Sequence, residues 1–166
     1  ARDRRHERAS TPGRRAPEAQ GRGGPAGGPS SLSRVQVARS RPDASVAHAG
    51  RDAPNECCGV VATREGAATT RHITENLAAS PFRFEIDGLA RMRLIDDIEG
   101  AGDELGVIYH SHTRSEPFPS QTDVNFAALW PGVEWLIVGV SKKADPEVRS
   151  YLIEDGRIRD VELEVM

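Results

Sequence analysis

Apolar residues in the second half of the chain follow two different spacings. Continuous apolar runs at residues 57–62, 105–109 and 135–140 predict strands that are buried on both faces. Between residues 89 and 98, apolar side chains recur every three positions among charged ones. That spacing predicts an amphipathic helix, which Gly100 ends.

Weaker patterns predict the remaining elements. Pro42 suits the first turn of a helix that it opens, although Gly50 weakens that helix. Ser120 and Asp123 have the spacing of a capping box before a second short helix. Short strands are predicted at residues 35–37, 71–75 and 82–86, and a hairpin at 148–153 and 157–164 around the turn Asp155-Gly156. The order predicts an α/β domain with a mixed β-sheet flanked by helices.

Composition divides the 166 residues into two parts. Residues 1–33 hold seven arginines, three acidic residues, six glycines and four prolines, with Leu32 as their only large apolar side chain. Such a segment cannot bury enough apolar surface to fold, so we expect a disordered tail. We interpret it as a dispensable extension, with RNA binding as the alternative. Residues 34–166 contain all eight aromatic side chains and are predicted to form one domain.

Charge and sequence signals narrow the class of protein. Residues 34–166 carry a net charge of −7, which argues against a nucleic-acid-binding domain. We find neither a signal peptide nor an apolar run long enough to cross a bilayer. The two cysteines, Cys57 and Cys58, are adjacent and form no disulfide framework. We therefore expect a cytoplasmic protein.

The residues that suggest chemistry lie at the end of one predicted strand and the start of the following helix. His110 and His112 alternate along an extended segment, so their imidazoles face the same side of the sheet. With Asp123 they supply two nitrogens and one oxygen, a set that suits catalytic Zn²⁺ with its fourth position left for water. Taken singly, each has an ordinary structural explanation, as a strand-end histidine or as part of a helix cap.

A catalytic zinc site also needs a proton acceptor. Glu56 lies just before the predicted strand at residues 57–62, where its carboxylate can project beside a metal at the end of the neighbouring strand. Alone, it would be interpreted as an exposed residue at a strand end.

Taken together, these residues resemble a known family. Glu56, followed by His110-Ser111-His112, seven residues, Ser120, two residues and Asp123, is similar to the motif of the JAMM (MPN+) zinc metallopeptidases. The resemblance covers about residues 35–165 and implies a single JAMM/MPN-type domain with cytidine-deaminase-like layering. It is strongest to short bacterial members that release cysteine from a ubiquitin-like sulfur-carrier protein.

The resemblance implies a role for each residue. His110, His112 and Asp123 would bind one zinc ion per chain, and Glu56 would be the general acid–base. Ser120 would donate a hydrogen bond to the oxyanion, a use that competes with capping the helix. Ser111 would support the loop by hydrogen bonding. Arg114 would meet a C-terminal carboxylate of the substrate, or else be a solvated loop arginine.

The implied reaction is hydrolysis of the amide bond at the C-terminal glycine of the carrier, a step in cysteine biosynthesis. Trimming another ubiquitin-like precursor or conjugate is the alternative, whereas the spacings leave little room for the insertions of polyubiquitin-cleaving members. A non-catalytic MPN scaffold would have lost a ligand or Glu56, and neither is lost. The motifs of zinc deaminases and of His-Glu-x-x-His peptidases are absent.

Overall fold

The structure is a computed structural model that describes residues 40–142 and 144–163, with side chains from residue 43 onwards. The predicted tail and the strand at residues 35–37 lie outside this part of the chain. The described residues form three helices and six strands, in the order α1 (Ser40–Asp52), β1 (Cys58–Arg64), β2 (Ala67–Thr74), α2 (Gly88–Gly100), β3 (Glu104–His112), α3 (Gln121–Ala127), β4 (Glu134–Gly139), β5 (Glu147–Glu154) and β6 (Arg157–Val161).

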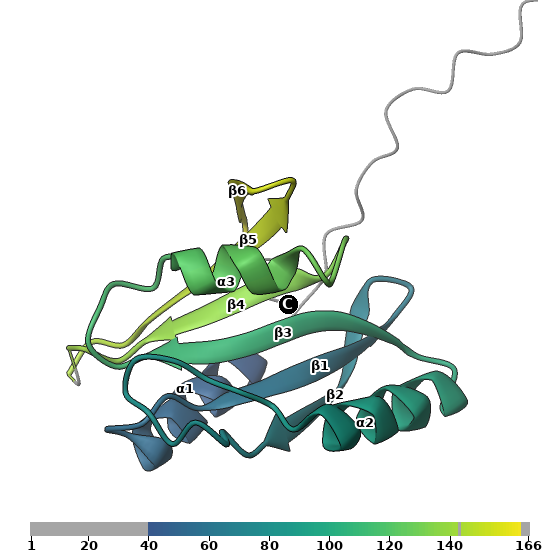
Figure 1. Ribbon diagram of the computed structural model, residues 1–166, viewed down its shortest axis with the longest axis horizontal. Coiled ribbons are helices and arrows are strands. Elements are labelled where there is room, and N and C mark those ends of the chain that lie inside the picture. Colours follow the sequence, from purple (N-terminus) through teal and green to yellow (C-terminus); the bar gives the residue numbers. More distant parts are fainter. Residues whose placement is uncertain (1–39, 143, 164–166) are drawn as a thin grey trace, which may run out of the picture. The chain divides into compact units, whose positions relative to one another are not determined.

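The six strands make one mixed sheet in the order β2-β1-β3-β4-β5-β6 (Figure 1). Strands β3 and β4 are parallel, and the other neighbouring pairs are antiparallel. The connection from β3 to β4 contains α3, because parallel neighbours need a crossover rather than a tight turn. The predicted α/β class with a mixed sheet is therefore confirmed.

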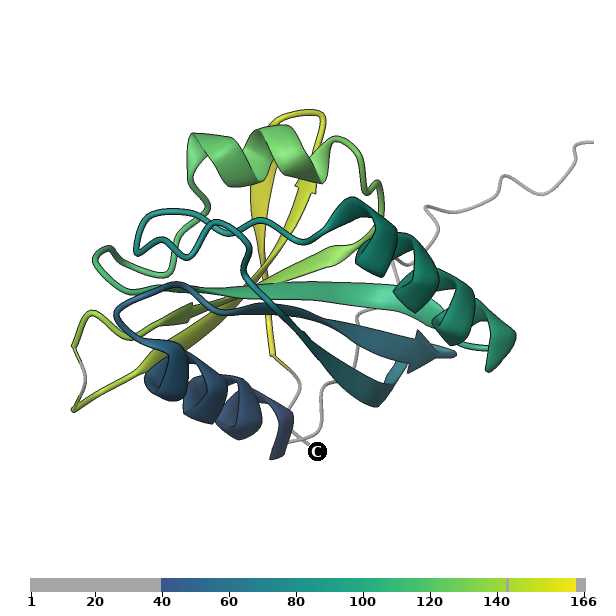
Figure 2. The ribbon, with the colours of Figure 1, turned by 60° about the horizontal axis from the view of Figure 1, so that its bottom comes forward.

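Both faces of the sheet are covered, which explains why the central strands are apolar without alternation. One core lies between the sheet and helices α2 and α3, and includes Ile98 and Ala127 from those helices. The other lies between the sheet and α1, and includes Ala49. Figure 2 shows α1 and α3 on opposite sides of the sheet. Successive residues of β4 alternate between the two cores, Trp135 and Ile137 facing one and Leu136 and Val138 the other.

Two hairpin turns use the left-handed backbone conformation. Glu65 and Gly66 join β1 to β2 with φ values of 51° and 79°, and Asp155 and Gly156 join β5 to β6 with φ values of 51° and 72°. Two consecutive residues with positive φ give a turn whose twist matches that of the strands. The hairpin predicted from Asp155-Gly156 is confirmed, although its second strand already ends at Val161.

The strand predicted at residues 82–86 is wrong, because this segment is a loop. Its backbone groups bond to the Asn76 side chain instead of to a strand. The amide of Asn76 donates to the Arg83 carbonyl at 3.1 Å, and its oxygen accepts from the Glu85 N–H at 3.0 Å. Hydrogen bonds to the Asn76 side chain thus take the place of the strand pairing that the apolar residues predicted.

Three elements are longer than their patterns predicted. Helix α1 continues through Gly50 to Asp52, and β2 begins at Ala67. Strand β3 extends through His112, so that both histidines of the motif belong to the strand. Among the described residues, no helix is long and apolar enough to cross a membrane.

Candidate metal centre

The two histidines and Asp123 meet beside the carboxyl end of β3. His110 and His112 extend from the last three residues of β3, while Asp123 lies in the first turn of α3. The Nε2 atoms of the two histidines are 3.1 Å apart. The Asp123 carboxylate lies 3.2 Å from His110 Nε2 and 3.5 Å from His112 Nε2. All three residues are at least 95% buried.

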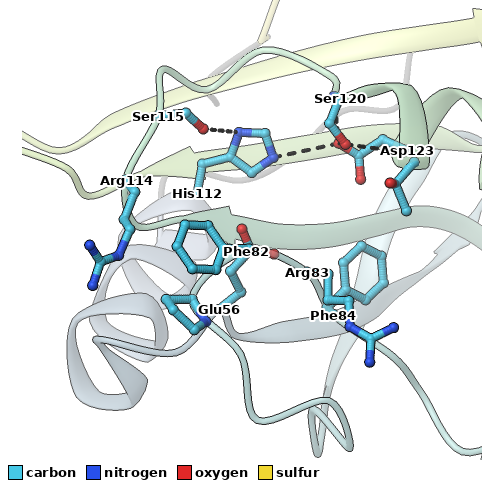
Figure 3. Close-up of a pocket in the computed structure, with 11 residues that line it drawn as sticks. Glu56, Phe82, Arg83, Phe84, His112, Arg114, Ser115, Ser120 and Asp123 are labelled. Carbon is cyan, nitrogen blue, oxygen red and sulfur yellow. Dashed lines mark hydrogen bonds and ion pairs between the residues drawn. The ribbon is translucent and has the colours of Figure 1, made fainter.

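Hydrogen bonding sets the tautomer of His112. Its Nδ1 lies 2.9 Å from the carbonyl oxygen of Glu116, and a carbonyl can only accept. Nδ1 therefore carries the hydrogen, and Nε2 keeps its lone pair toward His110 and Asp123. The same ring also has the Ser115 hydroxyl 3.2 Å from Nδ1 (Figure 3).

Asp123 is held by the helix that carries it. The Ser120 N–H and the Ser120 hydroxyl both donate to Asp123 Oδ2 at 2.7 Å, and Ser120 Oγ accepts from the Asp123 N–H. This is the capping box predicted from the sequence. Burial by itself raises the pKa of Asp123, but the neighbouring histidines and Ser120 outweigh it and hold that pKa well below its usual range.

Glu56 lies opposite this group across a small cavity. Strand β1 runs antiparallel to β3, with Cys58 paired to His110, so the residues just before β1 reach the end of β3. The Glu56 side chain is 95% buried. Burial raises the pKa of its carboxyl to about 7, and the charge of His112 only partly offsets this.

The cavity has a volume of about 240 Å³, and Glu56, His112, Ser120 and Asp123 line it (Figure 3). The loop that follows β2 contributes Phe82 and other residues to its wall. Arg114 also lines the cavity, and its guanidinium lies 5.3 Å from the centre of the Phe82 ring. The structure thus brings together all six site residues predicted from the sequence.

The donor set fits a metal ion. Ligand atoms of His110, His112 and Asp123 lie within 4.8 Å of one another. The lone pair of His112 Nε2 and the Asp123 carboxylate converge on the point that His110 Nε2 also faces, and a cation there satisfies all three. Two imidazole nitrogens with one carboxylate oxygen match the ligands of a catalytic zinc site.

Several supporting contacts were not predicted from the sequence. Phe84 stacks on the His110 ring with centroids 4.6 Å apart, and the Thr113 hydroxyl bonds the carbonyls of Pro54 and Pro81. No sequence signal distinguished these residues, because each acts through tertiary contact. The buried hydroxyl of Ser111, which was expected to support the loop, instead accepts from the Cys57 N–H at 2.8 Å and so joins β3 to the residue that follows Glu56.

Comparison with known proteins identifies the family. The model of the prokaryotic homologues of the JAB domain matches residues 39–154. The chain belongs to the JAB/MPN family. The JAMM resemblance seen in its motif is therefore confirmed.

Relatives of this JAB-domain chain are named as a peptidase, as desampylases and as a probable protease, which supports a hydrolase. The CysO-cysteine peptidase of Mycobacterium tuberculosis is 38% identical over 126 residues, covering 75% of this chain and 86% of the relative. A desampylase of Haloferax volcanii is 38% identical over 112 residues, covering 63% and 80%. A probable TtuB-protein conjugate cleaving protease of Thermus thermophilus is 32% identical over 140 residues, covering 84% and 88%.

Solved structures agree on the fold. A protein of Desulfitobacterium hafniense has a TM-score of 0.69 at 24% identity, covering 79% of this chain and 92% of that protein. A JAB1/MPN domain protein of Archaeoglobus fulgidus has a TM-score of 0.55 at 16% identity, covering 81% and 99%.

Proposed function

We propose that this JAB-domain protein is a zinc-dependent peptidase that cleaves the amide bond after the C-terminal glycine of a ubiquitin-like sulfur-carrier protein and so releases cysteine. The observation that carries the proposal is the convergence of His110, His112 and Asp123 at one point, with the Glu56 carboxylate lining the same cavity.

In this proposal the two histidines and Asp123 hold the ion. When bound, zinc activates water as a nucleophile and polarises the scissile carbonyl. The contacts behind the ligands support this use. The Glu116 carbonyl fixes the His112 ring, and the Ser120 N–H and hydroxyl orient the Asp123 carboxylate.

Glu56 moves the proton. Its carboxylate accepts a proton as the water oxygen bonds to the carbonyl carbon, and then gives that proton to the leaving amine as the C–N bond breaks. Burial raises the pKa of this carboxyl above its ordinary value, which suits the group to accept a proton and then to return it to an amine. In this step the Ser120 hydroxyl exchanges its bond to Asp123 for one to the developing oxyanion, while the Ser120 N–H keeps its bond to the Asp123 carboxylate.

The substrate assignment rests on the relatives. One acts on a CysO-cysteine adduct by its name, and another is named as cleaving TtuB-protein conjugates. Arg114 lines the cavity, and in this proposal it binds a carboxylate of the substrate. Cleavage of a carrier–protein conjugate is the second candidate, which the relatives named as desampylases favour.

Mass spectrometry tests the proposal. A sulfur-carrier protein bearing a C-terminal cysteine is incubated with the zinc-loaded protein, with and without a chelator. We expect the carrier to lose the mass of one cysteine residue, and the chelator to prevent this. An uncleaved adduct would contradict the proposed substrate, and cleavage of a carrier–lysine conjugate in a parallel reaction would favour the second candidate.

A further inference from the structure

Asn76 lies just after β2, at the start of the loop that was predicted to be a strand. Its side-chain amide donates to the Glu56 carbonyl at 2.9 Å and to the Arg83 carbonyl at 3.1 Å. Its side-chain oxygen accepts from the N–H groups of Ala78 and Glu85, each at 3.0 Å. These four bonds use both donors and both acceptor positions of the amide.

The backbone of Glu56 depends on this loop on both sides. The Glu56 N–H donates to the Ser80 carbonyl at 2.9 Å, and the Glu56 carbonyl accepts from Asn76. Glu56 lies two residues before β1, and its neighbour Cys57 is bonded to Ser111 of β3 through both its N–H and its carbonyl. The N–H and the carbonyl of Glu56 itself are bonded to the loop and not to a strand. The position of its carboxylate therefore depends on the loop as well as on the attachment of Cys57 to β3.

The same loop contacts the metal-ligand side of the site. Phe84 follows Arg83, whose carbonyl Asn76 holds, and its ring stacks on His110. Phe82, on the other side of Arg83, belongs to the cavity wall. The Asn76 amide thus bonds both to the backbone of Glu56 and to the loop whose aromatic side chains line the cavity and pack on His110.

We propose that Asn76 is a positioning residue for catalysis, which sets the Glu56 carboxylate relative to the metal ligands through its bond to the Glu56 carbonyl. The inference rests on the proposed function in taking Glu56 as the base. Asn76 itself does not line the cavity, so it acts on the reaction only through Glu56 and the loop.

The isosteric change Asn76→Asp distinguishes the acceptor function of the side-chain amide from its donor function. It keeps an oxygen to accept from Ala78 and Glu85 but loses the donors to Glu56 and Arg83. We expect kcat to fall roughly 10- to 100-fold, since a small displacement of a catalytic group costs this much. Bound zinc should stay at one ion per chain, because the ligands lie on β3 and α3. Amide exchange at Glu56 should become faster.

Two further variants make the test specific. Asn76→Ala has no added charge and must lose as much kcat as Asn76→Asp. Asn125→Asp is the matched control, because Asn125 is exposed on α3 and accepts only from Gln121, a bond that an aspartate keeps. Its kcat should equal that of the wild type.

Wild-type kcat in Asn76→Asp or in Asn76→Ala would overturn the inference, even if the melting temperature fell. Unchanged amide exchange at Glu56 would overturn it as well. If the wild-type protein does not cleave the cysteine adduct, that result contradicts the proposed substrate and not the role of Asn76. The exchange measurement then still tests the role of Asn76.

Discussion

The Glu56 carboxylate is a buried acidic group that lines the cavity together with Asp123. Water is displaced from it by the loop after β2 and by the end of β3, and this burial raises its pKa from 4.5 to about 7. A base with this pKa accepts a proton readily at neutral pH and also returns it to an amine. Burial therefore gives Glu56 both functions.

The pH dependence of the reaction follows from this pKa. Only ionised Glu56 accepts a proton, so kcat should fall as the pH drops through the pKa and level off above it. A bound cation favours the carboxylate, which places the midpoint of this limb between 4.5 and about 7. Turnover of the cysteine adduct measured from pH 4.5 to 8 tests this. A kcat that rises toward low pH would contradict a carboxylate base.

At the scale of elements, the site is assembled by the ends of β3 and α3 and by the residues before β1. The sequence predicted these elements because apolar runs and a capping box are local signals. It missed the loop at residues 82–86, because the apolar Phe82, Phe84 and Ile86 alternate as in a strand although the backbone bonds to Asn76. It also could not give the stacking of Phe84 on His110, which depends on that loop.

Ser120 belongs both to an element and to the reaction. Removing its hydroxyl in Ser120→Ala should lower kcat roughly 100-fold if it donates to the oxyanion, and lower stability by about 1 kcal/mol as a lost helix cap. Ser120→Gly costs only a few tenths of a kcal/mol as a cap, yet should lose the same kcat. Steady-state kinetics and denaturant unfolding of both variants separate the two uses. If kcat instead falls in Ser120→Ala and stays near the wild-type value in Ser120→Gly, as stability does, then Ser120 acts as a helix cap and does not donate to the oxyanion.

At the scale of the whole molecule, the family model begins at residue 39, close to the boundary at residue 34 predicted from composition. Among the described residues, the two cores that cover the faces of the sheet are built from residues between Val46 and Leu163. We therefore expect the domain to fold and to act without the arginine-rich segment.

Deleting residues 1–33 should accordingly leave the melting temperature and kcat/KM unchanged. The truncated and full-length chains are compared by thermal unfolding and by turnover of the cysteine adduct. A large loss of either would mean that this segment contributes to the domain or to substrate binding.

The central claim is that three residues hold the metal and a fourth, Glu56, moves the proton. The most direct test measures zinc content and adduct hydrolysis together in Glu56→Gln, with Asp123→Ala beside it. We expect Glu56→Gln to bind one zinc per chain and to lose hydrolysis, whereas Asp123→Ala loses both the metal and the activity. Near wild-type turnover in Glu56→Gln, or full zinc in Asp123→Ala, would contradict the account.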